Sequence, residues 1–483
     1  MISILPRAPL AALAAAMALA GCANLSGIAP QATMSTPGSV GLAPGVSATL
    51  APVAAWWRDL GDPQLDRLVA EAIAGNPNLK LAQARLVRAQ ALTEGARAGG
   101  GPQINGNGNA TRQRFTENGL YPPPIAGSQR TTADLGLSGS WELDFFGKHE
   151  AAVAAAVGAA RASEADTQAA KVLLASNVVR AYLQLARAND QLAVAQRSLE
   201  QRTESLRLVQ DRLRAGLDTQ LELRQSQGAL PEARQQIEAL REQAQLATHA
   251  LAALTGRGNR EPVEAQPSLA KLKVAPVPAQ LPSDLLGQRA DIVAARWRVE
   301  AAGQDVRSAQ AQFYPSVNIV GLVGLSSFGL GKLLDLGSTQ WSLGPAVHLP
   351  IFDAGRLRAN LRGKTADLDA AIESYNAAVL DAIRDAADQV ATGQSVARQQ
   401  AEQRDAQAAA EAAWDIAVQR YQAGLGTYLN VLAAETAVLN QRRLAVDLAA
   451  RALDAQVGLM RALGGGYRPD AATTTVAATA ANK

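Results

Sequence analysis

One spacing of 208 residues recurs along this chain and limits what it can fold into more than any other feature. It aligns three pairs of glycines: Gly147 with Gly355, Gly216 with Gly424, and Gly256 with Gly464. The runs that begin at Arg212 and Arg420 also share Arg, Ala, Gly, Leu and Thr at equivalent positions. A fixed spacing that recurs together with its neighbours indicates a tandem duplication. The 483 residues are therefore predicted to form one architecture made of two similar halves.

Each half contains a place where a period of two changes into a long helical pattern. From Ala133 to Phe145 the odd positions are apolar or glycine, while the even positions are polar or glycine. Such alternation predicts a β-strand with two different faces. After Gly147, and again after Gly355, the alternation stops and a long run without proline begins. These two glycines are therefore predicted to mark strand-to-helix junctions.

The long helical runs are predicted to fold back as antiparallel hairpins. An unbroken helix from Glu150 to Ala215 would be about 100 Å long, which no single globular domain needs. Gly216 and Gly424 are expected at the hairpin tips, because glycine tolerates the positive φ that ends a helix. The predicted segments are a first repeat at 55–256, a linker at 257–283, a second repeat at 284–464 and a flexible C-terminal tail at 465–483.

Four strands are predicted, two in each half, at about 103–114, 131–146, 316–326 and 339–352. Each has roughly nine or more residues, the length that a tilted strand needs to cross a bilayer, and the apolar faces carry no charge. Polar side chains on the other faces indicate a wet lumen: Asn105, Asn107, Asn109, Ser138 and Ser140. A four-stranded sheet packed on helices in a soluble domain remains an alternative, since such polar faces also occur on ordinary sheets.

The number of strands bears on oligomeric state. Four strands cannot close a barrel, for which about eight is the practical minimum. An open sheet edge cannot lie in lipid, because its backbone groups would have no hydrogen-bond partners. If these strands span a membrane, several copies of the chain must therefore contribute to one barrel.

The N-terminus is predicted to be a signal peptide at 1–21, with a short apolar run after Arg7. Cys22 is the only cysteine, so it cannot form an internal disulfide. Leu19-Ala-Gly-Cys22 resembles a bacterial lipobox, which implies that Cys22 is lipidated and becomes the first residue of the mature chain. Ala23 is not aspartate, which favours the outer membrane. Residues 22–54, rich in Ser, Pro, Gly and Thr, are predicted to be a flexible or surface-hugging tether.

Composition and motifs argue against other classes of function. A net charge of +3 without a basic cluster gives no support for a nucleic-acid partner. The three histidines, His149, His249 and His348, form no metal-spaced cluster, and no nucleophile elbow or phosphate loop occurs. We therefore expect no catalytic residue, no metal and no cofactor.

Six motifs together resemble the outer-membrane efflux lipoproteins of the TolC-like channel family. They are Trp56-Trp57, Gly61-Asp-Pro-Gln-Leu65, Asn76-Pro-Asn-Leu79, Trp141-Glu-Leu-Asp-Phe-Phe-Gly-Lys148, Leu281-Pro-Ser-Asp-Leu-Leu286 and Arg420-Tyr-Gln-Ala-Gly424. The resemblance covers roughly residues 55–465. It departs at Ala290, where family members usually carry proline, and this change can relax the start of a helix.

The resemblance implies a mainly α fold of the α+β class, in which a homotrimer builds one 12-stranded transmembrane β-barrel continued by a periplasmic α-helical barrel. It implies the exit duct of a tripartite efflux pump, passing drugs or other small molecules across the outer membrane of a Gram-negative bacterium. The implied partners are a periplasmic adaptor protein and an inner-membrane transporter of the RND type, with outer-membrane lipid held through Cys22. A duct for type I protein secretion and, less well supported, a periplasmic adaptor lipoprotein remain alternatives.

The resemblance also directs attention to the hairpin tips as a periplasmic gate. In similar channels, acidic side chains after the second tip glycine form rings, but the matching positions here are Asn430 and Ala433. The gate candidates are therefore Asp218, Glu222, Arg224, Arg420, Tyr421, Tyr428 and Asn430. Our hypothesis is that basic or tyrosine partners from neighbouring helices hold Glu222 and keep the inner end closed. A solvated helix end is the alternative.

Overall fold

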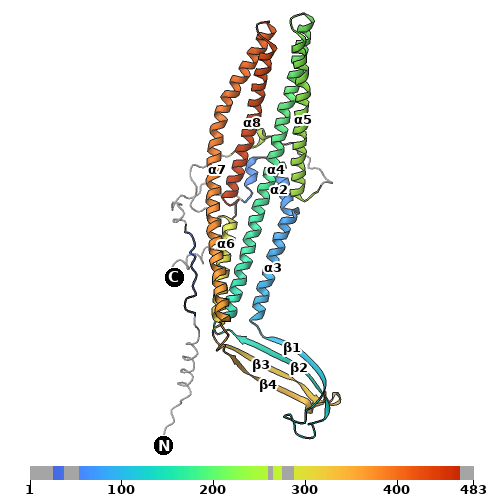
Figure 1. Ribbon diagram of the computed structural model, residues 1–483, viewed down its shortest axis with the longest axis vertical. Helices are drawn as coiled ribbons and strands as arrows, with labels where there is room; N and C mark the ends of the chain where they lie inside the picture. The colour runs from blue at the N-terminus through green and yellow to red at the C-terminus, as the bar shows by residue number, and fades with distance from the viewer. Residues whose placement is uncertain (1–24, 37–53, 259–264, 275–287, 468–483) are drawn as a thin grey trace. The chain divides into compact units, whose positions relative to one another are not determined.

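The computed structural model describes residues 25–36, 54–258, 265–274 and 288–467 (Figure 1). The predicted signal peptide and Cys22 lie outside the described residues. The chain divides into two compact units. The first contains Leu86–Ser163, Ala295–Tyr375 and the N-terminal residues up to Met34. The second contains Ser35–Arg85, Glu164–Ala294 and the residues from Asn376 onward.

The first unit contains a four-stranded antiparallel sheet in the order β1-β2-β3-β4 (Figure 1). The strands are β1 (Gln103–Arg114), β2 (Gln129–Leu143), β3 (Ser316–Phe328) and β4 (Thr339–His348). β1 pairs with β2, so that Asn105 lies opposite Ser138. On its other side β2 pairs with β3, where Ser138 lies opposite Leu322. Two hairpins, one from each half of the chain, thus join through β2 and β3 into a single sheet.

Two strands end earlier than the sequence predicts. β2 stops at Leu143 because the carboxylate of Asp144 accepts a 2.8 Å hydrogen bond from the backbone N–H of Glu150, at the start of the next helix. β4 stops at His348, and the carboxylate of Asp353 accepts backbone hydrogen bonds from Gly355 and Leu357. In both places a side chain that caps a helix ends the extended backbone before the predicted boundary.

The helices repeat in the two halves of the chain. The first half has α2 (Pro63–Gly75), α3 (Pro77–Gly99), α4 (Lys148–Arg214) and α5 (Gln220–Thr255), and the second has α6 (Ala290–Ala311), α7 (Arg356–Gln422) and α8 (Tyr428–Ala462). α4 and α7 have 67 residues each. The predicted fold class, mainly α with a small antiparallel sheet, is confirmed. Within the described part of the chain, every helix is too short or too polar to be a membrane span.

The sequence predicts that the first helix of the second half starts at Pro282 and lasts to about Phe313. Pro282 lies outside the described residues, and in the described part α6 runs from Ala290 to Ala311. At its start, the guanidinium of Arg289 binds the carboxylate of Asp291 at 2.6 Å, and this carboxylate also accepts the N–H of Ile292. A side-chain cluster at the residues around Ala290 therefore marks the start of the helix.

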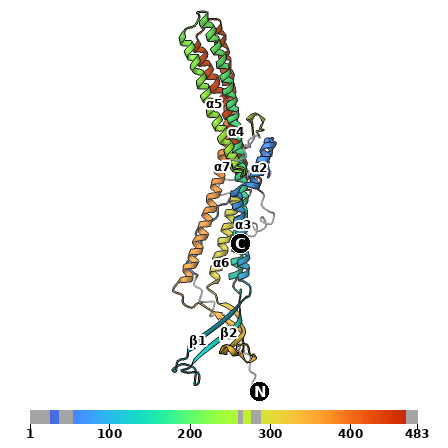
Figure 2. The same cartoon turned by 90° about the vertical axis from the view of Figure 1, so that its right-hand side faces the viewer.

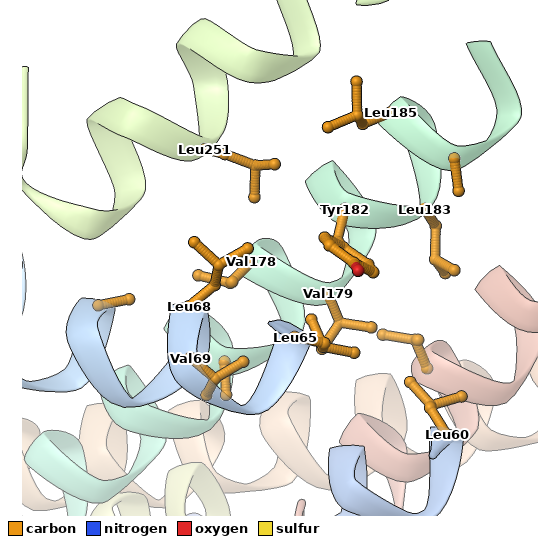
Figure 3. Close-up of a cluster of buried hydrophobic side chains, with 14 of the residues drawn as sticks. Leu60, Leu65, Leu68, Val69, Val178, Val179, Tyr182, Leu183, Leu185 and Leu251 are labelled. Carbon is orange, nitrogen blue, oxygen red and sulfur yellow. The ribbon is translucent and has the colours of Figure 1, made fainter. Parts of the chain in front are cut away.

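The second unit is held together by an apolar cluster that involves the first sequence motifs (Figure 3). Leu65 and Val69 of α2 face Val178 and Tyr182 of α4, and all four side chains are fully buried. Asp62 caps α2 by accepting the N–H of Gln64, and its second oxygen accepts the Tyr182 hydroxyl at 2.6 Å. Burial, followed by this carboxylate, raises the pKa of Tyr182, so the hydroxyl remains a donor. The Gly-Asp-Pro motif thus ties a helix start to the core.

Part of the predicted linker packs against the same cluster. Leu269 and Leu272, in and beside a short 3-10 helix at Leu269–Lys271, are buried in it. The backbone N–H of Leu269 also donates to the carboxylate of Asp190 at 2.9 Å. Residues 265–274 are therefore a packed segment of the second unit.

The described residues of the N-terminal tether, 25–36, lie along α7. The backbone N–H groups of Gln31 and Ala32 both donate to the carboxylate of Asp369, at 2.9 and 3.0 Å. Leu25 and Ile28 pack beside buried residues of α6 and α7. Of the two descriptions predicted for the tether, flexible or surface-hugging, the second fits residues 25–36.

Candidate functional site

The tips of the α4–α5 and α7–α8 hairpins lie at the same end of the second unit (Figures 1 and 2). Gly216 and Gly424 end α4 and α7 with φ values of 73° and 74°. At the first tip Leu217 N–H donates to the carbonyl of Arg212 at 2.9 Å, and at the second Leu425 N–H donates to Arg420 at 2.8 Å. Each long helix therefore ends in the same glycine-dependent turn.

Glu222 is used within its own helix, which differs from the contact we hypothesised. Thr219 precedes α5, and its hydroxyl oxygen accepts the N–H of Leu221 at 3.1 Å. The carboxylate of Glu222 accepts both the hydroxyl and the backbone N–H of Thr219. These hydrogen bonds, the hydroxyl first, lower the pKa of Glu222. Among the residues that the structure describes, the capping box with Thr219 holds this carboxylate, and no basic or tyrosine side chain binds it.

Asp218 takes the partners that were expected for Glu222. Its Oδ2 lies 3.2 Å from Nε of Arg212 and accepts the hydroxyl of Tyr421, which belongs to the other hairpin. The Asp218 side chain is 7% exposed and that of Arg212 is 12% exposed. We call Arg212, Asp218 and Tyr421 the tip cluster. It connects α4, the first tip turn and α7 through one largely buried carboxylate.

The tyrosine of the tip cluster is held in place on two sides. The guanidinium of Arg212 lies 4.5 Å from the centroid of the Tyr421 ring, a cation–π contact. The Tyr428 ring lies 5.7 Å from that ring, and both tyrosines pack with the buried Val209 and Val431. Burial and then the Asp218 carboxylate raise the pKa of Tyr421. Its hydroxyl is therefore protonated at any physiological pH and donates to Asp218.

The remaining gate candidates lie at the surface of the tips. Arg224 is exposed and donates to the side chain of Gln227 in its own helix. Arg420 is exposed and donates to the carbonyl of Leu425 in its own turn. Asn430 and Ala433 are exposed on α8. The structure therefore brings Asp218, Tyr421 and Tyr428 together and leaves Arg224, Arg420 and Asn430 outside the tip cluster.

Sequence reasoning missed three charged residues that matter here. Arg212 is not among the gate candidates, although it stands six residues before Asp218 across the tip turn. Arg202 of α4 binds Glu435 of α8 at 3.1 Å, with side chains 11% and 8% exposed. Burial raises the pKa of Glu435 although Arg202 opposes this change. No local motif signals the second pair, because its members come from different hairpins.

The strand-to-helix junctions are turns in the first unit. Gly147 and Gly355 have φ values of 73° and 88°. Beside them is a cavity of about 350 Å³, whose lining includes His149 and His348. Glu142 of β2 contacts Lys148 at 2.5 Å and His149 at 3.3 Å. Within the described residues, His, Cys, Asp and Glu side chains nowhere form a group of three that could hold a metal ion.

Comparison with known proteins identifies the family. The family model described as outer membrane efflux protein matches the chain twice, over residues 68–257 and 281–465. The chain belongs to the outer membrane efflux protein family. The two matched segments correspond to the two halves inferred from the 208-residue spacing.

Individual members of the outer membrane efflux protein family cover most of the chain. Fusaric acid resistance protein FusA of Burkholderia cepacia is 39% identical over 364 residues, 73% of this chain and 68% of that protein. Multidrug resistance outer membrane protein MdtP of Escherichia coli K12 is 34% identical over 432 residues, 86% of this chain and 87% of that protein. The crystal structure of outer membrane protein VceC of Vibrio cholerae is 34% identical, with a TM-score of 0.79, and covers 86% of this chain and 100% of that one. With the family match, these likenesses identify this chain as an outer-membrane efflux channel.

Proposed function

We propose that three copies of this chain form the exit duct of a tripartite efflux pump, together with a periplasmic adaptor and an inner-membrane transporter of the RND type. The observation that carries this proposal is the open sheet. In the described residues β1 pairs only with β2, and β4 pairs only with β3. Two unpaired edges cannot lie in lipid. Strands of other copies at both edges would complete a barrel, and three copies would supply twelve strands.

The faces of the sheet fit this arrangement. β2 directs Leu135 and Leu137 to one face, and both are about half exposed in the single chain. By register the same face continues to Leu325 and Val323 of β3, and to Trp341 of β4. The strands have 10 to 15 residues, enough to cross a bilayer when tilted. We assign this apolar face to lipid and the opposite face to the lumen.

Exposed apolar side chains on the helices support assembly with further copies. They include Leu246 on α5, Leu380 on α7, and Leu429 and Leu444 on α8, each between 44% and 61% exposed. Large apolar side chains in a polar helical rod are stabilised when a second helix covers them. We assign these positions to contacts between copies in a periplasmic helical barrel.

We further propose that the tip cluster closes the inner end of the duct. Its three side chains tie the turn after α4 to the last residues of α7, so the two hairpins of one chain cannot separate without breaking them. If the tips separated, Arg212 and Asp218 would each be a largely buried charge without its partner, which is unfavourable. An adaptor that competes for these groups could open the tips. Glu222 has a supporting role, because its capping box fixes the turn that carries Asp218.

Cys22 is proposed as a lipid anchor, on the evidence of the Leu-Ala-Gly-Cys sequence. The docked residues 25–36 support this role, because they bind the tether to α7 soon after the proposed anchor. For cargo, we propose small molecules including drugs. FusA and MdtP carry the names of fusaric acid resistance and multidrug resistance proteins, and such cargo fits a wet lumen.

The proposal is tested by deleting the gene and measuring susceptibility to a panel of drugs, dyes and detergents. We expect increased susceptibility that the full-length gene restores, and trimers in the outer-membrane fraction after cross-linking. A Cys22→Ser variant should restore less resistance and lose labelling with radioactive palmitate. Unchanged susceptibility across the panel, together with a purified protein that is monomeric without detergent, would overturn the proposed function.

A further inference from the structure

Two arginines end the apolar face of the sheet on β1. Arg112 lies opposite Thr131 of β2, and Arg114, two residues further on, points to the same face. Directly opposed residues share a face of a sheet, and Thr131 shares its face with Leu135, which the proposed function assigns to lipid. The expectation that the apolar faces carry no charge therefore holds on β1 only as far as Ala110. We call Arg112 and Arg114 the rim pair.

The rim pair lies at the height at which lipid headgroups are expected. β1 begins at Gln103, shortly after α3 ends at Gly99, so the rim pair is at the end of the strand away from α3. Arg114 lies about 33 Å along the strand from Ile104, the first residue of this face on β1. A strand tilted by about 40° rises roughly 25 Å over that length, which is the height of the apolar band in outer-membrane barrels. The rim pair therefore lies at the outer boundary of the hydrocarbon layer.

The described residues do little to neutralise the rim pair. None of their carboxylates lies within ion-pair distance of Arg112. Glu117, in the loop after β1, is 3.6 Å from Arg114, but the side chains are 74% and 68% exposed. An ion pair so exposed to water is weak. In the proposed barrel β4 of a neighbouring copy would lie beside β1, and β4 (Thr339–His348) contains no acidic residue. The two positive charges are therefore available to a ligand from outside the chain.

The surroundings of the rim pair restrict the kind of ligand. An anion dissolved in the lumen would meet the opposite face of the sheet. Hydrocarbon alone would leave the two charges without partners, which is costly. A lipid with phosphate groups can instead cover the apolar residues with its acyl chains while its phosphates accept hydrogen bonds from the guanidinium groups. Arginine suits this role, because its planar guanidinium can donate two hydrogen bonds to one phosphate.

We propose that the rim pair is a binding site for phosphorylated lipid headgroups in the outer leaflet of the outer membrane. This inference rests on the proposed function, because it requires the apolar face to meet lipid. Three copies would place one rim pair at each of three positions around the barrel. Since the arginines stay with the layer of phosphates, the three pairs would also fix the height of the barrel in the membrane.

The test is binding of diphosphoryl lipid A to the purified full-length protein in detergent. Native mass spectrometry measures the fraction of the protein that carries the lipid at each lipid concentration. In the Arg112→Gln/Arg114→Gln variant we expect the dissociation constant to rise about tenfold, and in each single variant about threefold. Monophosphoryl lipid A, which has one phosphate fewer, should bind the wild-type protein less tightly and should lose less affinity in the double variant.

Arg130→Gln is the matched control for the rim pair. Arg130 of β2 lies opposite Gln113, the residue between Arg112 and Arg114, so it is at the same level of the sheet but on the other face. Its replacement removes one positive charge, as each single rim variant does. We expect the dissociation constant of diphosphoryl lipid A to change less than about twofold in this control.

The possible results separate this inference from the proposed function. Equal lipid A binding by the wild type and the double variant, in a protein that still restores drug resistance, would overturn the lipid site and leave the duct intact. A loss in Arg130→Gln but not in the double variant would reverse the assignment of faces and contradict both. If the double variant fails to assemble, the single variants decide. A loss as large in Arg130→Gln as in Arg112→Gln would show that binding follows net charge alone, which would also overturn the site.

Discussion

The two hairpin tips have the same backbone and different chemistry. Both follow a helix of 67 residues and turn at a glycine with φ near 74°. The 208-residue spacing pairs Asp218 with Gly426 and Glu222 with Asn430, so the first tip has two carboxylates and the second has none at these positions. Conversely, Tyr421 of the second tip occupies the place of Leu213 in the first.

This difference indicates that the duplication produced two equivalent turns and that later substitutions gave their side chains different roles. The first tip contributes the acceptor, and the second contributes the donor that binds it. The arginines show the same division. Arg212 reaches Asp218 across its turn, whereas the equivalent Arg420 donates to the backbone carbonyl of Leu425. A link between hairpins thus arises from two turns that were once equivalent.

The largest effect is expected from Asp218→Ala. This change leaves Arg212 buried without its partner, at a cost of about 3 kcal/mol to the local opening free energy of the tips. Hydrogen exchange of the tip amides measures this quantity. Asp211→Ala is the matched control, because its ion pair with Arg214 is mostly exposed and should contribute less than about 1 kcal/mol. Equal protection in the two variants would show that the tip cluster does not hold the hairpins together.

The two glycine turns should respond alike. Gly216→Ala and Gly424→Ala each place a side chain at positive φ, which costs about 1–2 kcal/mol. Gly228→Ala, in the interior of α5 with open space around it, should instead stabilise by about 0.5–1 kcal/mol. Thermal denaturation of the three variants checks the signs. A clear difference between the two tip variants would contradict the equivalence of the backbone turns.

The helix starts after the turns should differ. Thr219→Ala removes a capping hydroxyl and should cost about 1 kcal/mol, seen as faster exchange of the first amides of α5. Thr427→Ala removes a side chain that makes no capping hydrogen bond to α8 and should have almost no effect. Similar losses at both positions would mean that the second tip has a cap equivalent to the first.

The smallest effect is a dependence on pH that only the first tip should have. The pKa of Glu222 is lowered in the folded chain, chiefly by the Thr219 hydroxyl. Its stabilising contribution is therefore present above the unfolded pKa of about 4.3 and is lost as the pH falls through the lower folded value. The protection factors of the first amides of α5, which are corrected for the intrinsic exchange rate at each pH, should fall in acid, and those of α8 should not. A Glu222→Gln variant that keeps the full acid response would assign the response elsewhere.

The scaffold of the tips could be predicted from sequence because its signals are local. A glycine after a long helical pattern fixes the turn at Gly216 and Gly424, and the repeat spacing predicts both at once. The partner of Asp218 could not be predicted in this way. The Thr219-Gln-Leu-Glu222 spacing is the local signature of a capping box, whereas only packing decides that Asp218, four residues before Glu222, meets Tyr421.

In the sheet, too, the features with local sequence signals were predictable and those set by packing were not. Alternation predicted four strands, and hydrogen-bonding capacity predicted that four were too few to close. The strand ends were less predictable, because Asp144 and Asp353 cap helices instead of extending the ladder. Val320 and Leu322 also break the alternation in β3, and their place beside polar residues becomes visible only from the register with β2 and β4.

Single-channel conductance of the Asp218→Asn/Tyr421→Phe protein in planar bilayers tests the central account most directly. If the tip cluster holds the inner end closed, the double variant should conduct several-fold more than the wild type, while Glu222→Gln should stay close to the wild-type value. Equal conductance in the double variant and the wild type, or an increase with Glu222→Gln alone, would contradict the assignment of the gate to Asp218, Arg212 and Tyr421.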